Sequence, residues 1–146
     1  MSLLPEGHFL IGKILFELIE AIEPPIQGVG GPTLGADPII SAVSYTSYLE
    51  ANPIPAFIIR KEPKGHGTGK WIEGTAGLPE KARVVIVEDV VTTGGSAIKA
   101  AKKAEEAGFE VVKILALVDR DEGGRKVVEE AGYILEALFT RHDFMD

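Results

Sequence analysis

The sequence predicts an α/β fold in which helices cover both faces of a mostly parallel central sheet. Apolar runs rich in Val and Ile, at 56–59, 84–87 and 111–118, are typical of strands buried on both sides. Segments with helical spacing separate these runs, as in the connections of a parallel sheet. The 146 residues suffice for one domain, expected to span 1–146.

Two helices with a short strand between them are expected in the first third of the chain. Pro5 suits the first turn of a helix, and the paired prolines at 24–25 end that helix. A short strand follows at 26–30. The second helix covers 38–49, and Asp37 is its expected N-cap because an Asp side chain accepts hydrogen bonds from free first-turn amides.

A long excursion is expected after the second helix. The strand at 56–59 runs into 60–70, which is too rich in glycine to be either helix or strand. Residues 71–74 return as a short strand, so the stretch between them is the tip of a hairpin-like excursion. The buried strand at 84–87 follows it.

The last part of the chain alternates regularly. The expected elements are a helix at 96–107, a strand at 111–118, a helix at 125–131 and a strand at 134–139. Glycines 108 and 132 stand directly after the two helices, where many helices end. Ligands of parallel sheets bind beyond the carboxyl ends of the strands. The loops to consider are therefore 30–36, 60–70, 88–96 and 119–124.

Composition excludes several classes of function. A net charge of −7 argues against a protein that binds duplex nucleic acid, which needs a clustered positive surface. The absence of cysteine excludes thiol catalysis, disulfides and cysteine-bound zinc. The three histidines are too widely spaced for a short metal motif. With no long apolar stretch, we expect a cytoplasmic protein without nucleic-acid or membrane partners.

The segment that follows the strand at 84–87 carries the most chemical information. Its residues are Glu88, Asp89, Val90, Val91, Thr92, Thr93, Gly94, Gly95 and Ser96. The Thr/Gly turn places free amides and hydroxyls at a helix N-terminus, which favours a phosphate dianion. The two acids can accept hydrogen bonds from a diol or hold Mg²⁺ through its waters. A phosphate pocket beside a diol pocket indicates a ribose 5-phosphate, although Thr, Ser and Gly are also ordinary turn formers.

The stretch 60–70 holds the densest positive charge of this acidic chain. Its basic residues are Arg60, Lys61, Lys64, His66 and Lys70. Two of them directly follow a buried strand, and the glycines beyond make the tip mobile. That arrangement suits a lid over a polyanion, and a solvated surface loop is the alternative.

Both segments resemble those of a known family. Residues 84–95 resemble the donor-binding signature of phosphoribosyltransferases. That signature has four apolar residues, two acids, two apolar residues, then Thr, a small residue, Gly and a small residue. The string Arg-Lys-Glu-Pro-Lys-Gly-His-Gly-Thr-Gly resembles the catalytic loop of orotate phosphoribosyltransferases, and not that of the purine enzymes. The resemblance implies a type I phosphoribosyltransferase fold with a flexible catalytic loop.

The activity implied by the resemblance is Mg²⁺-dependent transfer of a 5-phosphoribosyl group to orotate. The donor is phosphoribosyl pyrophosphate, and the products are orotidine 5′-monophosphate and pyrophosphate, in the biosynthesis of UMP. Residues 88–96 would bind the donor, with Glu88 and Asp89 holding Mg²⁺ indirectly, through water or substrate. Lys64, His66 and Asp89 would be the catalytic residues.

The resemblance also implies roles for other loops. Arg60, Lys61, Lys64 and His66 would contact the pyrophosphate, and the 30–37 loop would offer backbone amides to it. Some bacterial relatives carry a lysine in that loop where this chain has Gly35. Arg120 would bind the carboxylate of orotate, because a guanidinium matches a carboxylate. A surface ion pair with its acidic neighbours is the alternative.

Further expectations follow from the family. Its members form homodimers in which the catalytic loop reaches into the neighbouring subunit's site. They usually begin with several dozen more residues that help to cover the base, so this chain is expected to be truncated or naturally shortened. Two alternatives stay open: a regulatory or inactive protein that binds the same donor, and a phosphoribosyltransferase for another base.

Overall fold

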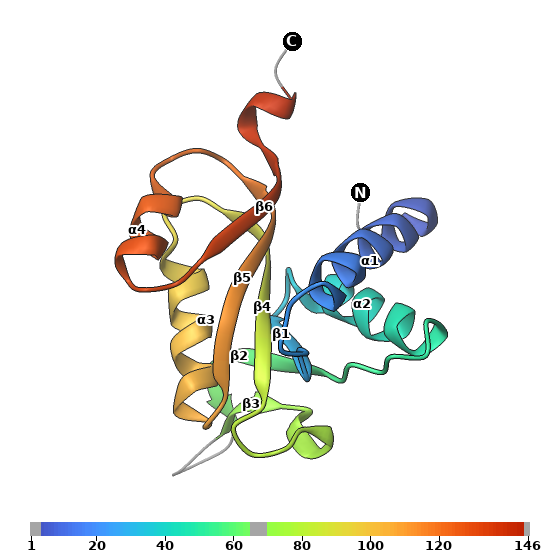
Figure 1. Ribbon diagram of the computed structural model, residues 1–146. Helices are drawn as coiled ribbons and strands as arrows, with labels where there is room; N and C mark the ends of the chain where they lie inside the picture. Colours follow the sequence, from blue (N-terminus) through green and yellow to red (C-terminus); the bar gives the residue numbers. More distant parts are fainter. Residues whose placement is uncertain (1–3, 65–69, 145–146) are drawn as a thin grey trace.

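The computed structural model describes residues 4–64 and 70–144 (Figure 1). Its α-helices are α1 (Pro5–Glu20), α2 (Asp37–Leu49), α3 (Gly95–Glu106) and α4 (Gly124–Glu130). Its strands are β1 (Gly28–Pro32), β2 (Ala56–Lys64), β3 (Lys70–Glu73), β4 (Arg83–Val91), β5 (Glu110–Asp119) and β6 (Leu135–Thr140). Two short 3-10 helices are η1 (Thr75–Gly77) and η2 (Arg141–Phe144).

The strands form one six-stranded sheet in the order β3-β2-β1-β4-β5-β6. Neighbouring strands are parallel except β2 and β3, which are antiparallel. Helices α1 and α2 lie on one side of the sheet, and α3 and α4 lie on the other (Figure 1). The predicted α/β class with a mostly parallel, doubly covered sheet is therefore confirmed.

Strand β4 shows why its sequence is apolar without alternation. Val84 and Ile86 belong to the core cluster beneath α3, whereas Val85 and Val87 belong to the cluster beneath α1 and α2. Successive side chains of a strand point to opposite faces, so a strand between two cores is apolar at every position. The turn that follows β4 is thus attached to a strand whose residues 84–87 are fully buried.

Two strands are several residues longer than the sequence predicts. Strand β4 continues through the two acids to Val91, because Val90 and Val91 still pair with Val118 and Asp119 of β5. Strand β2 continues to Lys64, which pairs with Lys70 of β3. The prediction that 60–70 contains no strand is therefore wrong for 60–64, a part of the stretch that has no glycine.

Asp37 is not the N-cap that the sequence predicts. Ala36 holds that position, and Asp37 is already the first residue of α2. The chain is wound before the helix begins, because Asp37 N donates to Leu34 O. The Asp37 side chain accepts a hydrogen bond from Thr33 Oγ1 at 2.8 Å and caps no amide.

No helix in the described ranges combines the length and the apolar character that a membrane crossing requires.

Candidate active site

The carboxyl ends of β1, β4 and β5 meet at one edge of the sheet and bring three of the predicted loops together. A Cβ atom on Gly31 would collide with the carbonyl oxygen of Val87. One on Gly35 would lie 2.5 Å from Asp89 Oδ2. The glycine-rich turn after β1 therefore lies directly against the acidic end of β4, as a shared site requires.

Glu88 and Asp89 are neighbours in sequence with different surroundings. Glu88 is 5% exposed, and its Oε2 accepts a hydrogen bond from Ser96 Oγ at 2.9 Å. Its Oε1 accepts one from the backbone N–H of Asp89 at 3.2 Å. Burial, reinforced by the adjacent Asp89 carboxylate, raises the pKa of Glu88 to about 7, while the Ser96 hydroxyl opposes that rise. Glu88 is thus an internal anchor for the start of α3.

Asp89 is the acid that remains available to a ligand. It is half-buried, its Oδ1 accepts the Val90 N–H at 2.8 Å, and its Oδ2 faces Gly35. Nowhere in the described parts of the chain do three or more His, Cys, Asp or Glu side chains gather around a possible metal position. Mg²⁺ is often held by one or two carboxylates together with phosphate oxygens of the substrate. Asp89 fits that mode of binding, whereas both oxygens of Glu88 already accept hydrogen bonds from the protein.

The turn from Thr92 to Ser96, which we call the phosphate turn after its predicted ligand, has the geometry of an anion site. Gly94 is the N-cap of α3 at φ +90°, and no side chain caps the helix. The first-turn amides of this 12-residue helix are therefore free to meet an anion. Gly124 closes the turn from behind, since a Cβ atom there would lie 2.5 Å from Thr92 O.

A cationic pocket lies beside this turn. It has a volume of about 320 Å³ and lies between the end of β1, the middle of β2 and the part of α3 from Gly95 to Lys103. Its lining residues are Pro32, Thr33, Ile59, Arg60, Lys61, Gly95, Ser96, Lys99, Ala100 and Lys103. The structure thus brings the predicted Arg60 and Lys61 to the phosphate turn. Lys64 lies at the end of β2, and His66 is outside the described residues.

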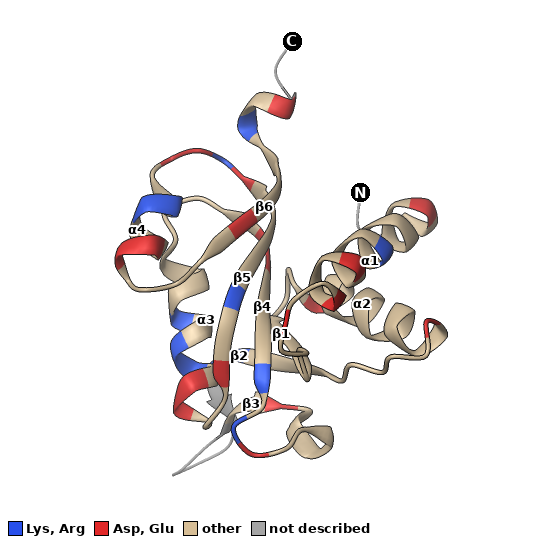
Figure 2. Cartoon of the chain, in the orientation of Figure 1, with Lys and Arg blue, Asp and Glu red and all other residues tan. Residues whose placement is uncertain are grey.

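The sequence prediction missed the two lysines of α3 that line this pocket. Lys99 and Lys103 follow one another at i and i+4 on a helix that begins at the phosphate turn, a spacing that places them on one face. Basic residues gather on this part of α3 (Figure 2). Lys103 Nζ also lies 4.0 Å from the ring centre of Trp71. The spacing identifies a shared basic face of the helix but not the strands that this face meets.

Arg120 stands just beyond the end of β5, beside the phosphate turn. Its backbone N–H donates to Val91 O at 3.0 Å. Its exposed guanidinium pairs with Glu122, with Nε 3.1 Å from Oε2. The surface ion pair that the sequence left open as an alternative is thus present, at a place where a ligand carboxylate could replace Glu122.

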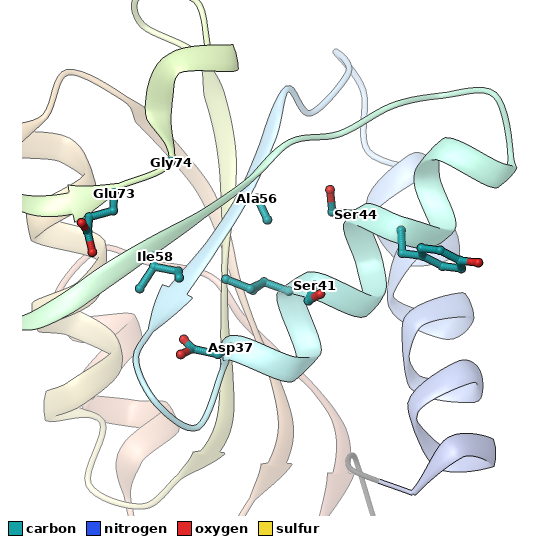
Figure 3. A pocket seen from close by; sticks show the side chains of 9 residues that line it. Asp37, Ser41, Ser44, Ala56, Ile58, Glu73 and Gly74 are labelled. Carbon is teal, nitrogen blue, oxygen red and sulfur yellow. The ribbon is translucent and has the colours of Figure 1, made fainter.

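A larger cavity lies elsewhere, on the α2 side of the sheet. It measures about 690 Å³ and lies between α2, β2 and β3 (Figure 3). Asp37, Ser41 and Ser44 line it from α2, and Glu73 lines it from β3. Neither Asp89 nor the phosphate turn contributes to it, so volume does not locate the chemistry in this molecule.

Comparison with known proteins agrees with the geometry of the strand ends. The phosphoribosyl transferase domain family matches residues 9–135. The orotate phosphoribosyltransferase of Aquifex aeolicus is 50% identical over 141 residues, covering 97% of this chain and 75% of that protein. That of Nostoc is 50% identical over 143 residues, covering 98% and 68%.

A solved structure is also similar. Orotate phosphoribosyltransferase of Mycobacterium tuberculosis in complex with 5-phospho-α-D-ribosyl 1-diphosphate matches with a TM-score of 0.83 and 33% identity, over 99% of this chain and 79% of that one. The resemblance drawn from residues 60–69 and 84–96 is confirmed. The chain belongs to the phosphoribosyl transferase domain family, among the orotate phosphoribosyltransferases.

Proposed function

We propose that this chain transfers the 5-phosphoribosyl group of phosphoribosyl pyrophosphate to orotate, giving orotidine 5′-monophosphate and pyrophosphate. The observation that carries the proposal is the uncapped phosphate turn of α3, directly after the acidic end of β4. Relatives about half identical to this chain bear the name of this activity. The similar Mycobacterium tuberculosis structure holds the donor itself.

The donor lies along the strand ends in this proposal. Its 5-phosphate accepts hydrogen bonds from the amides of 92–96 and from the hydroxyls of Thr92 and Thr93. Asp89 accepts from the ribose hydroxyls, and the pyrophosphate lies toward the 30–36 turn and the cationic pocket. Arg60, Lys61, Lys64 and His66 belong to the pyrophosphate end, with Lys99 as an additional cation at the pocket wall.

The chemical step is a displacement at the anomeric carbon of the ribose. Such a step passes through an oxocarbenium-like state, in which positive charge develops on the sugar and negative charge on the departing pyrophosphate. Lys64 and His66 stabilise the leaving group, and the carboxylate of Asp89 lies on the side of the sugar. Water is excluded when the basic stretch covers the donor, which prevents hydrolysis.

Mg²⁺ belongs to this proposal as the donor's counter-ion. Asp89 would hold it together with oxygens of the donor, through water or directly. When bound, the ion neutralises charge on the pyrophosphate.

Arg120 is the proposed contact of the orotate carboxylate. It projects from the end of β5 next to Val91, so it can meet a base attached to a ribose held at Asp89. Its present partner, Glu122, is a carboxylate on an exposed surface, and exposed pairs of this kind contribute little, about 0–1 kcal/mol. A substrate carboxylate can therefore replace it at small cost. Thr92, which directly follows Val91, is proposed to reach the base as well.

We also propose a homodimer in which the 60–70 stretch of one subunit reaches the site of the other. Helix α2 carries Tyr45, Tyr48 and Leu49, all largely exposed, beside the cavity that it forms with β2 and β3. Clustered exposed aromatic residues indicate an interaction surface. The enzyme is proposed to act in the cytoplasm, since its polyanionic donor does not cross membranes unaided.

An assay of the purified chain tests this function. Orotate, donor and Mg²⁺ should yield pyrophosphate and orotidine 5′-monophosphate, and omission of orotate should abolish pyrophosphate release. Donor binding in calorimetry without turnover would instead favour the regulatory alternative. Turnover with another base and none with orotate would favour the second alternative.

The replacement Asp89→Asn tests the ribose site. Loss of a charged hydrogen-bond acceptor should weaken donor binding about 10- to 100-fold, corresponding to roughly 1.5–3 kcal/mol. The fold should persist, because Asp89 lies at the strand end and an Asn oxygen can still accept the Val90 N–H. Calorimetric titration with donor and Mg²⁺ measures the change.

The matched control for Asp89→Asn is Glu80→Gln, which removes one negative charge from an exposed residue before β4, at the opposite edge of the sheet. It should leave donor affinity unchanged. Equal donor affinity in Asp89→Asn and the unmodified protein would refute the assignment of the ribose site.

A further inference from the structure

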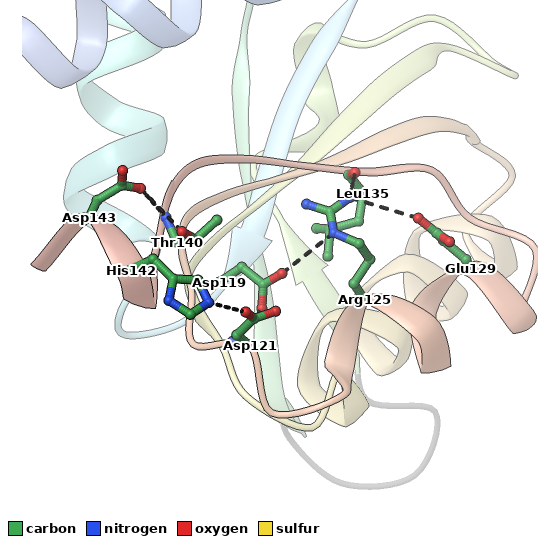
Figure 4. A network of polar contacts seen from close by, with 8 residues as sticks. All are labelled: Asp119, Asp121, Arg125, Glu129, Leu135, Thr140, His142 and Asp143. Carbon is green, nitrogen blue, oxygen red and sulfur yellow. Dashed lines mark hydrogen bonds and ion pairs between the residues drawn. The ribbon is translucent and has the colours of Figure 1, made fainter. Parts of the chain in front are cut away.

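The loop that carries Arg120 is fixed from both sides by charged residues. This loop connects β5 to α4, and the proposed base-binding arginine is its first residue. Its guanidinium is exposed, so the place where it meets a ligand depends on how firmly the backbone beneath it is held. The contacts of the loop with α4 and η2 show how that is done (Figure 4).

The inner contact is made by Asp119, the last residue of β5. It is 1% exposed, and its Oδ1 accepts the backbone N–H of Asp121 at 2.9 Å. Its Oδ2 lies 3.5 Å from Nε of Arg125. Arg125 in turn donates from Nη1 to Leu135 O at 2.7 Å. One buried carboxylate therefore ties the loop to α4 and to the start of β6.

The outer contact is made by the short helix η2. Nε2 of His142 lies 2.9 Å from Oδ2 of Asp121, as Figure 4 shows. Asp121 has a positive φ of 62°, so this contact fastens the residue at which the loop turns back. Asp143 holds η2 itself in place, since its Oδ2 accepts the Thr140 N–H at 2.6 Å.

The opposite side of the loop is attached to the phosphate turn. Arg120 N donates to Val91 O, and Gly124 packs against Thr92 O. The loop is thus held between the phosphate turn on one side and η2 on the other. The contact with η2 is made at Asp121, the residue directly after Arg120.

We propose that His142 and Asp121 are a positioning pair that sets the place of Arg120 for the carboxylate of the base. This inference rests on the proposed function and deepens it, because it locates part of the base specificity in a C-terminal residue outside the pocket. His142 itself contacts no proposed substrate position. Charged neighbours of the pair in sequence are Arg120 and Glu122 on the loop and Arg141 and Asp143 on η2, and the Asp119 carboxylate contacts Asp121 through its backbone N–H.

Steady-state kinetics of three variants test the pair. The contact is exposed, so His142→Ala should raise the KM for orotate only modestly, about threefold. The kcat at saturating orotate and the KM for donor should stay within error of the unmodified enzyme. His142→Gln should restore the KM, because a Gln Nε2 can donate to Asp121 from nearly the same place. Arg141→Ala is the matched control, because it removes an exposed cation from the same 3-10 turn and leaves the His142–Asp121 contact in place.

A double-mutant cycle decides whether the effect passes through Arg120. In an Arg120→Ala background, His142→Ala should change the KM for orotate no further. An equal additional rise would show that His142 acts elsewhere and would overturn the inference. So would an unchanged KM in His142→Ala, or an equal rise in the KM for donor.

The failure of the inference is distinguishable from that of the proposed function. If the unmodified chain neither binds nor converts orotate, the proposed function fails and the inference fails with it. If it converts orotate and His142→Ala behaves identically, only the inference fails. Melting temperatures of all variants show whether any of them has lost its fold.

Discussion

Glu88 and Asp89 carry the same functional group, but as neighbours on a strand they point to opposite faces of the sheet and have different surroundings. Alternation along β4 sends the Glu88 side chain toward α3, where Ser96 donates to it, and leaves the Asp89 side chain beside Gly35. The first acid is buried and the second is half-buried. Only the second can give up its hydration to a ligand without breaking a contact within the protein.

The raised pKa of Glu88 makes stability depend on pH. The carboxyl group titrates near 4.5 in the unfolded chain and near 7 in the folded protein. Between these values the folded state binds more protons, so the free energy of unfolding falls as pH rises from about 4.5 to about 7. The contribution of this group is fully present below that window and lost above it.

Glu88→Gln should therefore remove this dependence. The amide keeps the hydrogen-bonding capacity toward Ser96, whose hydroxyl can accept as well as donate. Above about pH 7 the variant should be more stable than the unmodified protein, by at most about 3 kcal/mol. Melting temperatures across the window test this against Glu80→Gln, an exposed control. Parallel curves for Glu88→Gln and the unmodified protein would contradict the prediction.

The sequence predicted the order of elements in the 84–96 segment well, but it did not predict the different roles of Glu88 and Asp89. A buried strand, a Thr/Gly turn and a helix are local features, so their order can be read from consecutive residues. Which of two adjacent acids points inward depends on β4 continuing through both of them to Val91, whereas the sequence predicts a strand only over 84–87. The same limit applies to Asp37, whose role as N-cap was lost because the preceding turn was already wound.

At the scale of elements, the junction of β4 and α3 depends on one glycine more than on its neighbour. Gly94 has φ +90°, and a Cβ atom there would lie 3.0 Å from both Gly124 O and a methyl of Val128. Gly95 has no neighbouring atom within 4 Å of such a Cβ. The two adjacent glycines therefore form a matched pair.

Gly94→Ala should destabilise the protein by about 1–2 kcal/mol from the left-handed backbone alone, and by more through the contact with α4. Gly95→Ala should leave the free energy of unfolding nearly unchanged, because alanine suits the first turn of a helix. Denaturant titration of both variants measures the difference. Equal destabilisation by the two replacements would show that the turn is not held by the backbone of Gly94.

The sequence predicted only two of the four basic residues that line the cationic pocket. Arg60 and Lys61 were found because they follow a buried strand in a run of basic residues. Lys99 and Lys103 were missed because they join the pocket only when α3 packs over β1 and β2. Residues brought together by packing of distant elements leave little trace in a linear pattern.

At the scale of the whole molecule, the proposed dimer can be tested by a substitution on the exposed surface of α2. Tyr48 is 75% exposed near the end of α2. Tyr48→Glu should place a charge in the interface and shift the protein to monomers, with loss of turnover because each site then lacks the neighbouring stretch. Light scattering over a range of concentrations, together with the orotate assay, measures both effects.

The control for Tyr48→Glu is Ile134→Glu, since Ile134 is similarly exposed but precedes β6 at the other end of the sheet. It should leave the oligomeric state unchanged. A monomeric unmodified protein with full turnover would refute the shared site.

The placement of Trp71 has a practical consequence. It is the only tryptophan of the chain, it lies in β3 at the foot of the basic stretch, and Lys99 and Lys103 approach its ring to 5.2 and 4.0 Å. Lys99 and Lys103 also line the cationic pocket, so an anion bound there draws on the charges that surround the indole. Its fluorescence should thus serve as an intrinsic optical reporter on the proposed pyrophosphate end of the site, readable in real time without attaching any dye.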